Sequence, residues 1–165
     1  MARYARPSHP PVQQRGMALI VCLIMLLLLT MVGVSSMQNA TLQEKMAGSV
    51  KFRNESFQAA ELALRVGENA VAASSFVLGP CANENCLPPP ASDYGVRTAA
   101  GAGSRNITWV AAGTSLYGVQ NIGTTTAPVN PPTGCTSQST TLYRITAIGF
   151  SGTSRSVVES VYGKC

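Results

Sequence analysis

Histidine and charged residues are scarce in this sequence. Only 12% of its 165 residues are Asp, Glu, Lys or Arg, about half of the usual share in soluble domains. His9 is the single histidine, so the rest of the chain cannot build a Ser–His–Asp triad or a histidine metal site. C-x-x-C pairs are absent too, which disfavours zinc. We therefore expect no metal, no cofactor and no enzymatic activity.

The basic residues are unevenly distributed. The net charge is +5, from 12 basic and 7 acidic residues. Arg3, Arg6 and Arg15 precede a long apolar segment, and without these three the balance is 9 to 7. The remaining Lys and Arg are scattered singly, so we expect no nucleic-acid partner. Basic residues ahead of an apolar helix are instead typical of a topology signal that keeps this end in the cytoplasm.

Residues 16–43 contain no charged side chain. Within them, residues 17–37 are apolar at nearly every position and, at 1.5 Å per residue, cover roughly 30 Å, the hydrocarbon thickness of a bilayer. We interpret this segment as a transmembrane helix. A cleaved secretory signal is the alternative, but such signals have a shorter apolar core followed by a small-residue cleavage site.

Proline is absent from Val12 to Gly79, so nothing breaks a helix that continues past the apolar segment. We expect one helix from about Met17 to about Phe76, ended by Gly79-Pro80. Apolar or small residues recur along it at steps of three or four, which predicts a stripe on one helical face. The stripe, which should pack against the rest of the chain, comprises Leu42, Met46, Val50, Phe57, Ala60, Leu64, Gly67, Val71, Ser75 and Leu78.

The character of the sequence changes after Gly79. Residues 80–102 are loop-rich, and strands are predicted over 105–111, 116–122, 140–150 and 155–162, the last two as an antiparallel hairpin. A small sheet with one apolar face would bury the stripe of the helix. The expected fold class is therefore α+β, a long N-terminal helix packed on a small antiparallel sheet.

Four cysteines follow the apolar segment, and a fifth, Cys22, lies within it. An even set outside a membrane segment indicates an oxidising compartment and disulfide bonds. Four cysteines allow three pairings. We favour Cys81–Cys86 together with Cys135–Cys165.

The N-terminal third of the chain resembles a known family. A basic leader ending in Arg15-Gly16 directly before an apolar helix is similar to a type III signal peptide. In addition, three motifs resemble the PilX-type minor pilins of Gram-negative type IV pili, and with them the pilin fold. These motifs are Gln14-Arg15-Gly16, Leu42-Gln-Glu-Lys-Met46-Ala-Gly48 and Phe57-Gln-Ala-Ala-Glu61.

The resemblance implies a processing site and a division of the chain. Prepilin peptidase would cleave between Gly16 and Met17 and methylate the new N-terminus at Met17. Residues 1–16 would then be a removed leader. Residues 17–43 would be the transmembrane and fibre-core half of the helix. Residues 44–165 would be a periplasmic head that includes the amphipathic half of the helix and the sheet.

The resemblance also indicates which residues contact neighbouring subunits. Most pilins carry Glu at the fifth mature position, where it is thought to pair with the N-terminal ammonium of the adjacent, earlier subunit. Val21 stands there in this sequence. A subunit without this carboxylate is disfavoured as a repeating unit but acceptable as the first one. Phe57, Glu61 and Arg65 are further candidates, and Glu61 could pair with Arg65 at i, i+4 or with a basic residue of a neighbouring subunit.

These features predict an assembly protein of the inner membrane and the pilus, at the pilus tip, that helps to initiate polymerisation. The partners implied by the resemblance are other minor pilins, the major pilin, a tip-associated adhesin, the inner-membrane assembly platform and prepilin peptidase. A minor pseudopilin of type II secretion is one alternative. A pilus-borne adhesion or aggregation subunit is another, for which the polar loop 124–138 could serve. An anchored periplasmic enzyme would need a catalytic constellation that we do not find.

Overall fold

The computed structural model describes residues 15–129, 135 and 139–165. The predicted leader up to residue 14, and most of the polar loop 124–138, therefore lie outside the described residues. The chain divides into two compact units, of which the first ends at Met46 and the second begins at Ala47. We call the second unit, Ala47–Cys165, the head.

Helix α1 (Arg15–Ala72) belongs to both units. In the first unit every described side chain from Gly16 to Met46 is exposed, and this part is long and apolar enough to cross a membrane. Three of its hydroxyl groups bond within the helix, since Thr30 donates to Leu27 O at 2.8 Å, Ser35 to Met31 O at 2.9 Å and Thr41 to Gln38 O at 2.9 Å. Hydroxyl groups that bond to their own helix in this way suit an apolar environment.

Among the described residues, five antiparallel strands form one sheet in the order β1-β2-β3-β4-β5, so each strand pairs with its neighbour in sequence. The strands are β1 (Gly101–Ala102), β2 (Thr108–Ala112), β3 (Ser115–Thr125), β4 (Thr140–Ser151) and β5 (Ser154–Lys164). The predicted hairpin is confirmed, because β4 and β5 pair without a break from Ser151↔Ser154 to Thr141↔Lys164. Gly152 turns the chain there with a φ of 53°, a value that favours glycine.

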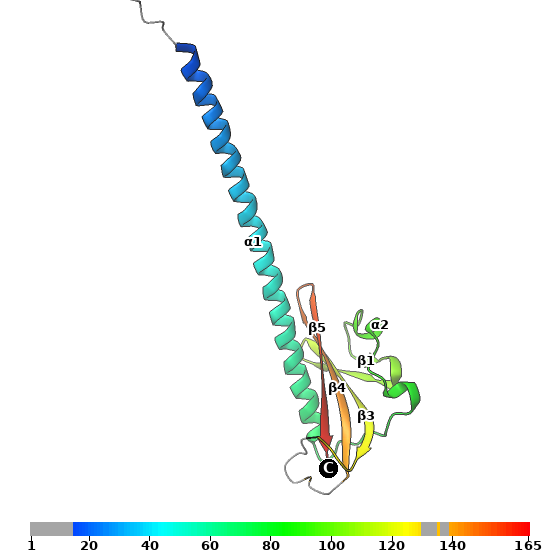
Figure 1. Cartoon of the computed structure of the whole chain (residues 1–165). Coiled ribbons are helices and arrows are strands. Elements are labelled where there is room, and N and C mark those ends of the chain that lie inside the picture. The colour runs from blue at the N-terminus through cyan, green and yellow to red at the C-terminus, as the bar shows by residue number, and fades with distance from the viewer. Residues whose placement is uncertain (1–14, 130–134, 136–138) are drawn as a thin grey trace, which may run out of the picture. The chain divides into compact units, whose positions relative to one another are not determined.

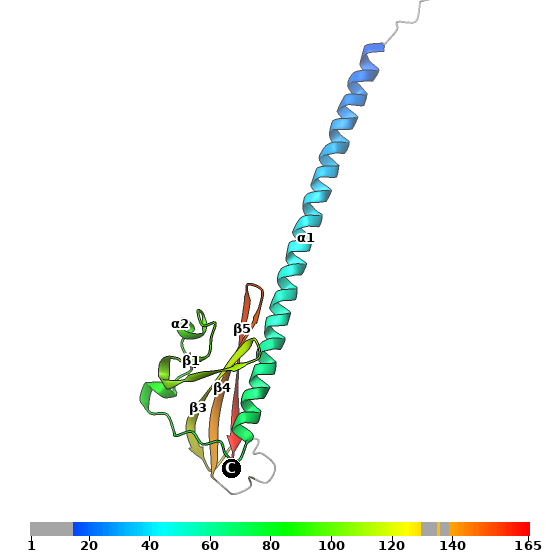
Figure 2. The ribbon, with the colours of Figure 1, turned by 180° about the vertical axis from the view of Figure 1, so that it is seen from behind.

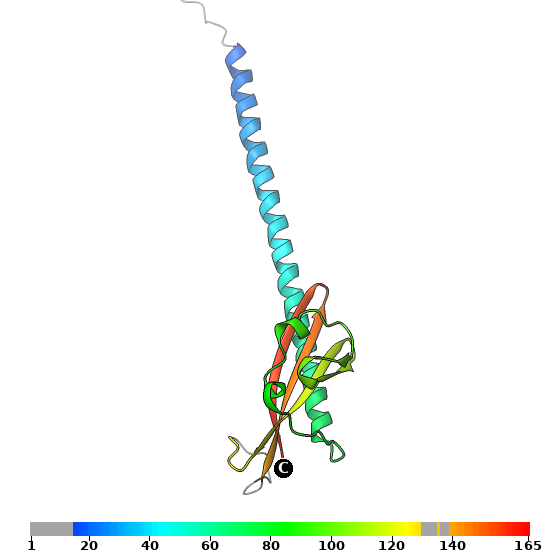
Figure 3. The ribbon, with the colours of Figure 1, turned by 90° about the vertical axis from the view of Figure 1, so that its right-hand side faces the viewer.

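One face of the sheet carries the head portion of α1 (Figures 1 and 3). Alternate residues of β4 point toward the helix, and Tyr143, Ile145 and Ala147 are buried there. Small helix residues meet them, notably Ala63 and Gly67. The α+β architecture expected from the sequence is therefore confirmed.

The opposite face of the sheet is covered as well, by the segment between α1 and β2 (Figure 2). This segment contains two short 3-10 helices, η1 (Asn83–Cys86) and η2 (Ser104–Asn106), and the one-turn helix α2 (Ala91–Tyr94). A second cluster fills the space beneath it and comprises Ile107, Trp109, Leu116 and Ile148, with Tyr94 and Phe150 packed against it. The sheet thus has two apolar faces, whereas the sequence analysis expected one.

The predicted helical stripe is wrong in its first half. Ala60, Gly67 and Val71 are buried as expected, but Leu42, Met46, Val50 and Phe57 are exposed. The first buried residue of the helix is Ser56, and Ser56 and Ala63, which the stripe did not include, are buried instead. Periodicity identifies an apolar face but does not say how much of it the rest of the chain covers.

Two predicted boundaries also shift. Helix α1 ends at Ala72 and not at Phe76, and the Lys164 ammonium donates to Ala73 O at 2.6 Å and Phe76 O at 3.2 Å just beyond its end. A cation there satisfies carbonyls that the helix leaves free. Strand β2 begins at Thr108 and not at Arg105, because Arg105 and Asn106 have φ values of 53° and 56°, which no strand residue adopts.

Candidate functional site

The predicted processing residues lie in the first turn of α1. Gly16 and Met17 are both exposed, and the space beside Gly16 is open to a distance of 4 Å. Val21 follows one turn later, with about half of its surface exposed, among apolar neighbours that are exposed as well. This part of the helix offers an uncharged surface to its surroundings, and lipid or other apolar helices are the partners that suit it.

The head portion of α1 carries three predicted contact residues at intervals of four, and all three are exposed: Phe57, Glu61 and Arg65. Phe57 lines a groove beside β5, whereas Glu61 and Arg65 point into solvent. Among the described residues no ion pair joins Glu61 to Arg65. The i, i+4 pair is therefore not formed among these residues, and the contact of Glu61 with a neighbouring subunit stays a prediction.

The cysteines of the head are paired as Cys81–Cys86 and Cys135–Cys165, with Cα–Cα distances of 5.2 and 5.8 Å. These are the pairs that the sequence analysis favoured. The first bond closes η1, and the second ties the residue after β5 to the β3–β4 connection. Cys22 of the first unit is an exposed free thiol.

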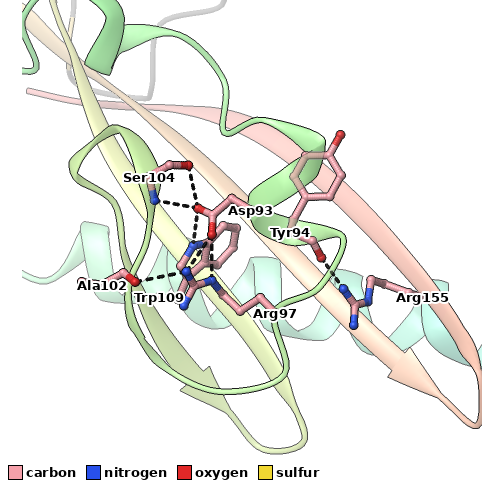
Figure 4. Close-up of polar contacts among 7 residues, drawn as sticks. All are labelled: Asp93, Tyr94, Arg97, Ala102, Ser104, Trp109 and Arg155. Atoms are coloured by element: carbon pink, nitrogen blue, oxygen red, sulfur yellow. Dashed lines mark hydrogen bonds and ion pairs between the residues drawn. The ribbon is translucent and has the colours of Figure 1, made fainter.

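A buried carboxylate organises the segment on the second face of the sheet (Figure 4). Asp93 is only 8% exposed, and its Oδ1 accepts hydrogen bonds from Arg97 Nη2 at 2.6 Å and Nε at 3.1 Å. Its Oδ2 accepts from the Ser104 amide and hydroxyl, both at 3.0 Å, and from Trp109 Nε1 at 3.2 Å. Gly103 fits closely here, because a Cβ at this position would lie 2.6 Å from Asp93 Oδ2. Asp93 thus joins α2, η2 and β2, and it is fully engaged in structural contacts.

The hydrogen bonds to Asp93 favour the ionised form of its carboxyl group. Burial acts to raise the pKa of this carboxyl, but the hydrogen bonds from Arg97, Trp109 and Ser104 outweigh burial and lower the pKa below its ordinary value. Asp93 therefore stabilises the head while it is ionised. This contribution is complete above the pKa of the unfolded chain, about 3.9, and is lost as the pH falls through the lower pKa of the folded state.

Replacing Asp93 with Asn is expected to lower the free energy of unfolding by about 2–4 kcal/mol at pH 7, because Arg97 loses its buried partner. The difference in free energy of unfolding between this variant and the parent protein should shrink below pH 4, because Asp93 of the parent becomes protonated as the pH falls through its lowered pKa. Urea unfolding of the full chain in detergent, followed by circular dichroism at pH 7 and pH 3, measures both values. Glu84→Gln, at an exposed carboxylate, is the control. A deficit for Asp93→Asn that is the same at both pH values would contradict this assignment.

Other polar contacts attach the same segment to the sheet. Arg155 on β5 donates to Tyr94 O and lies 5.0 Å from the centre of the Phe150 ring. Arg144 on β4 pairs with Glu159 at 3.1 Å and donates to Cys86 O at 2.6 Å. Glu159 and Asp93 are thus held in separate structural contacts, and among the described residues no cluster of three potential metal ligands occurs.

Comparison with known proteins agrees with the N-terminal features. Residues 15–65 match the model of a protein family described as PilX N-terminal. This match, over about a third of the chain, supports the resemblance to the PilX-family minor pilins of type IV pili. PilX-family pilins are structural pilus subunits and not enzymes. No curated protein and no solved structure matches the chain.

The PilX match ends within the head portion of α1. It includes Gly16, Met17, Val21, Phe57, Glu61 and Arg65, but none of the strands. The residues of this matched segment could be predicted from local sequence patterns, whereas the Asp93 network could not. The one local signal for that network was the spacing of Asp93 and Arg97, which suits an i, i+4 pair.

Proposed function

We propose that this chain is a minor pilin of the complex that initiates type IV pilus assembly and then occupies the pilus tip. In this proposal prepilin peptidase removes residues 1–16 and methylates Met17. Residues 17–43 anchor the subunit in the inner membrane before assembly and lie in the fibre core afterward. Residues 44–165 contact other minor pilins, the major pilin, the inner-membrane assembly platform and a tip-associated adhesin from the periplasmic side.

Val21 is the observation that carries the proposal. A charged side chain within a membrane is costly unless a partner neutralises it. In a repeating pilin, Glu at this position would neutralise the ammonium group of the preceding subunit. Val21 cannot do so, and no other charged residue occurs in 16–43 to replace it. A first subunit has no preceding ammonium to neutralise, so the valine has no cost there.

The surface of the first unit supports assembly by transfer of the helix. Large apolar residues are exposed around the helix, including Leu19, Ile24 and Leu29. Lipid and a bundle of apolar helices cover such a surface about equally well, so moving from one to the other changes the hydrophobic free energy little. Packing contacts with neighbouring helices then favour the fibre over the lipid bilayer.

The position of the subunit in the fibre tests the proposal. Antibody against the head, applied to pili and viewed by electron microscopy, is expected to label one end, while antibody against the major pilin labels the whole length. Cells that lack the subunit are expected to make few or no pili. Labelling along the shaft in proportion to its length would contradict the tip assignment.

The same deletion distinguishes the alternatives. Normal numbers of pili combined with lost attachment or aggregation would favour an adhesion subunit. Normal pili combined with a defect in protein secretion would favour a minor pseudopilin.

A further inference from the structure

Strand β5 forms one edge of the sheet and is 11 residues long. The two-residue turn Gly152-Thr153 closes on Ser151 and Ser154, so every second residue of β5, starting from Ser154, bonds to β4. The backbone N–H and C=O groups of the residues between them point away from the sheet. Among the described residues no other strand and no loop pairs with these outward groups. They belong to Arg155, Val157, Glu159, Val161 and Gly163.

The other edge of the sheet is protected against further pairing, and β5 is not. Strand β1 has only two residues, and beyond the end of β2 the Cys81 amide donates to Asn121 O on β3 at 2.8 Å. Strand β5 contains no proline, and its register with β4 has no bulge. Proline, bulges and very short strands are the usual means of protecting an edge. The edge of β5 is therefore long, regular and open to another strand.

The charged side chains of β5 are engaged within the head. Glu159 pairs with Arg144 at 3.1 Å, and the Lys164 ammonium donates to Ala73 O at 2.6 Å. Arg155 donates to a backbone carbonyl of α2. The strand thus lacks the free charges that keep other chains away from many sheet edges.

Both faces of β5 have room beside the edge. Toward α1, a groove of about 460 Å³ is lined by Asn54 and Phe57 of the helix and by the beginning of β5. On the opposite face, a hollow of about 380 Å³ is lined by apolar residues that include Leu142, Pro128 and Val161. Phe57 is 47% exposed and Val161 55%, so the side chains of an added strand would bury both.

A row of outward N–H and C=O groups is complementary to an extended chain, so the occupant that suits this edge is a β-strand. A second copy of β5 suits it poorly. Glu159 is the midpoint of the strand, and the antiparallel register that pairs all of β5 with a second copy places two Glu159 side chains directly opposite each other. Like charges in that position destabilise a strand pair. A strand with a hydrogen-bond donor opposite Glu159 avoids this cost.

We propose that β5 receives an extended segment of another protein as a further strand of the sheet. This segment carries apolar residues opposite Val157 and Val161, and a lysine, arginine, serine or threonine opposite Glu159. Its sequence therefore alternates as apolar, any residue, donor, any residue, apolar. The inference concerns the head alone and does not rest on the tip assignment.

The test uses the full chain in cells that make pili. Photoreactive benzoylphenylalanine at Val157 is expected to cross-link to another protein at a segment with this pattern. Val161→Pro removes an outward N–H but no bond to β4, and it should lower the cross-link yield about tenfold. Val161→Thr is the matched control, because threonine keeps the N–H and the β-branched shape, and its yield should stay close to that of the parent.

A third variant keeps the test decisive if the proline disturbs folding. Val161→Lys changes no backbone group and should lower the yield about threefold, since lysine at an edge opposes pairing. Urea unfolding followed by Trp109 fluorescence shows whether the proline variant is folded, and where it is not, the lysine and threonine variants decide. A cross-link to β5 of a second copy, no cross-link from Val157, or equal yields in the disrupting and threonine variants would overturn the proposal.

Discussion

Replacing Gly149 with alanine is expected to lower the free energy of unfolding of the head by about 2–5 kcal/mol. Gly149 lies on β4 directly beneath α1. A Cβ at this position would lie 2.1 Å from Ser56 O and 2.2 Å from Ala60 N. Both are backbone atoms of the helix, so no side chain can rotate away to make room. The helix must instead lift from the sheet, which exposes part of the core around Ala63 and Tyr117.

Gly48→Ala is the matched control for this variant. Gly48 also lies in the head portion of α1, but a Cβ there would meet nothing within 4 Å. Alanine should therefore raise the free energy of unfolding by about 0.5–1 kcal/mol through its higher helix propensity. Fluorescence of Trp109, the single tryptophan and 1% exposed, reports urea unfolding of the head in both variants. Equal stability of the two variants would contradict the close approach of helix and sheet.

Replacing Gly16 with leucine is expected to abolish incorporation of the subunit into pili. In the proposed function Gly16 precedes the bond that prepilin peptidase cleaves, and a bulky side chain there should block access to that bond. The uncleaved chain would keep the three leader arginines on the cytoplasmic side, where positive charge resists transfer into an apolar environment. The variant should accumulate in the inner membrane at full length, and sheared pili should contain none of it.

Gly33→Leu separates blocked processing from a general disturbance of the helix. Gly16 and Gly33 both lie in the first unit of α1, and a Cβ at either position meets nothing within 4 Å. The Gly33 variant should be processed normally, whatever its effect on packing in the fibre. Loss of processing in both variants would indicate that cleavage does not depend on Gly16.

The sequence predicted those parts of the head that depend on local pattern. The absence of proline predicted the long helix, and the alternation in 140–162 predicted the β4–β5 hairpin with nearly the observed limits. These features depend on properties of neighbouring residues, such as backbone restriction and side-chain direction. The favoured disulfide pairs are also those of the structure, although three pairings were open.

Features that depend on contacts between distant segments were not predicted. Ser56 is buried where α1 meets the sheet, and its hydroxyl bonds there to Ser156 at 2.7 Å, a partner one hundred residues away. Position 149 leaves no room for a side chain because α1 approaches β4 closely there. The residues around position 149 do not reveal that approach. Asp93 gathers donors from residues 97, 104 and 109, and their convergence depends on the conformation of the loops between them. Local patterns carry no information on any of these distances.

The intact mass of the protein, purified from the membranes of cells that contain prepilin peptidase, tests the central claim most directly. A processed pilin should have the mass of residues 17–165 with one added methyl group and with four hydrogens lost to two disulfides. An unprocessed mass, or a chain cut after the apolar segment 17–37, would contradict the assignment of this protein as a processed pilin.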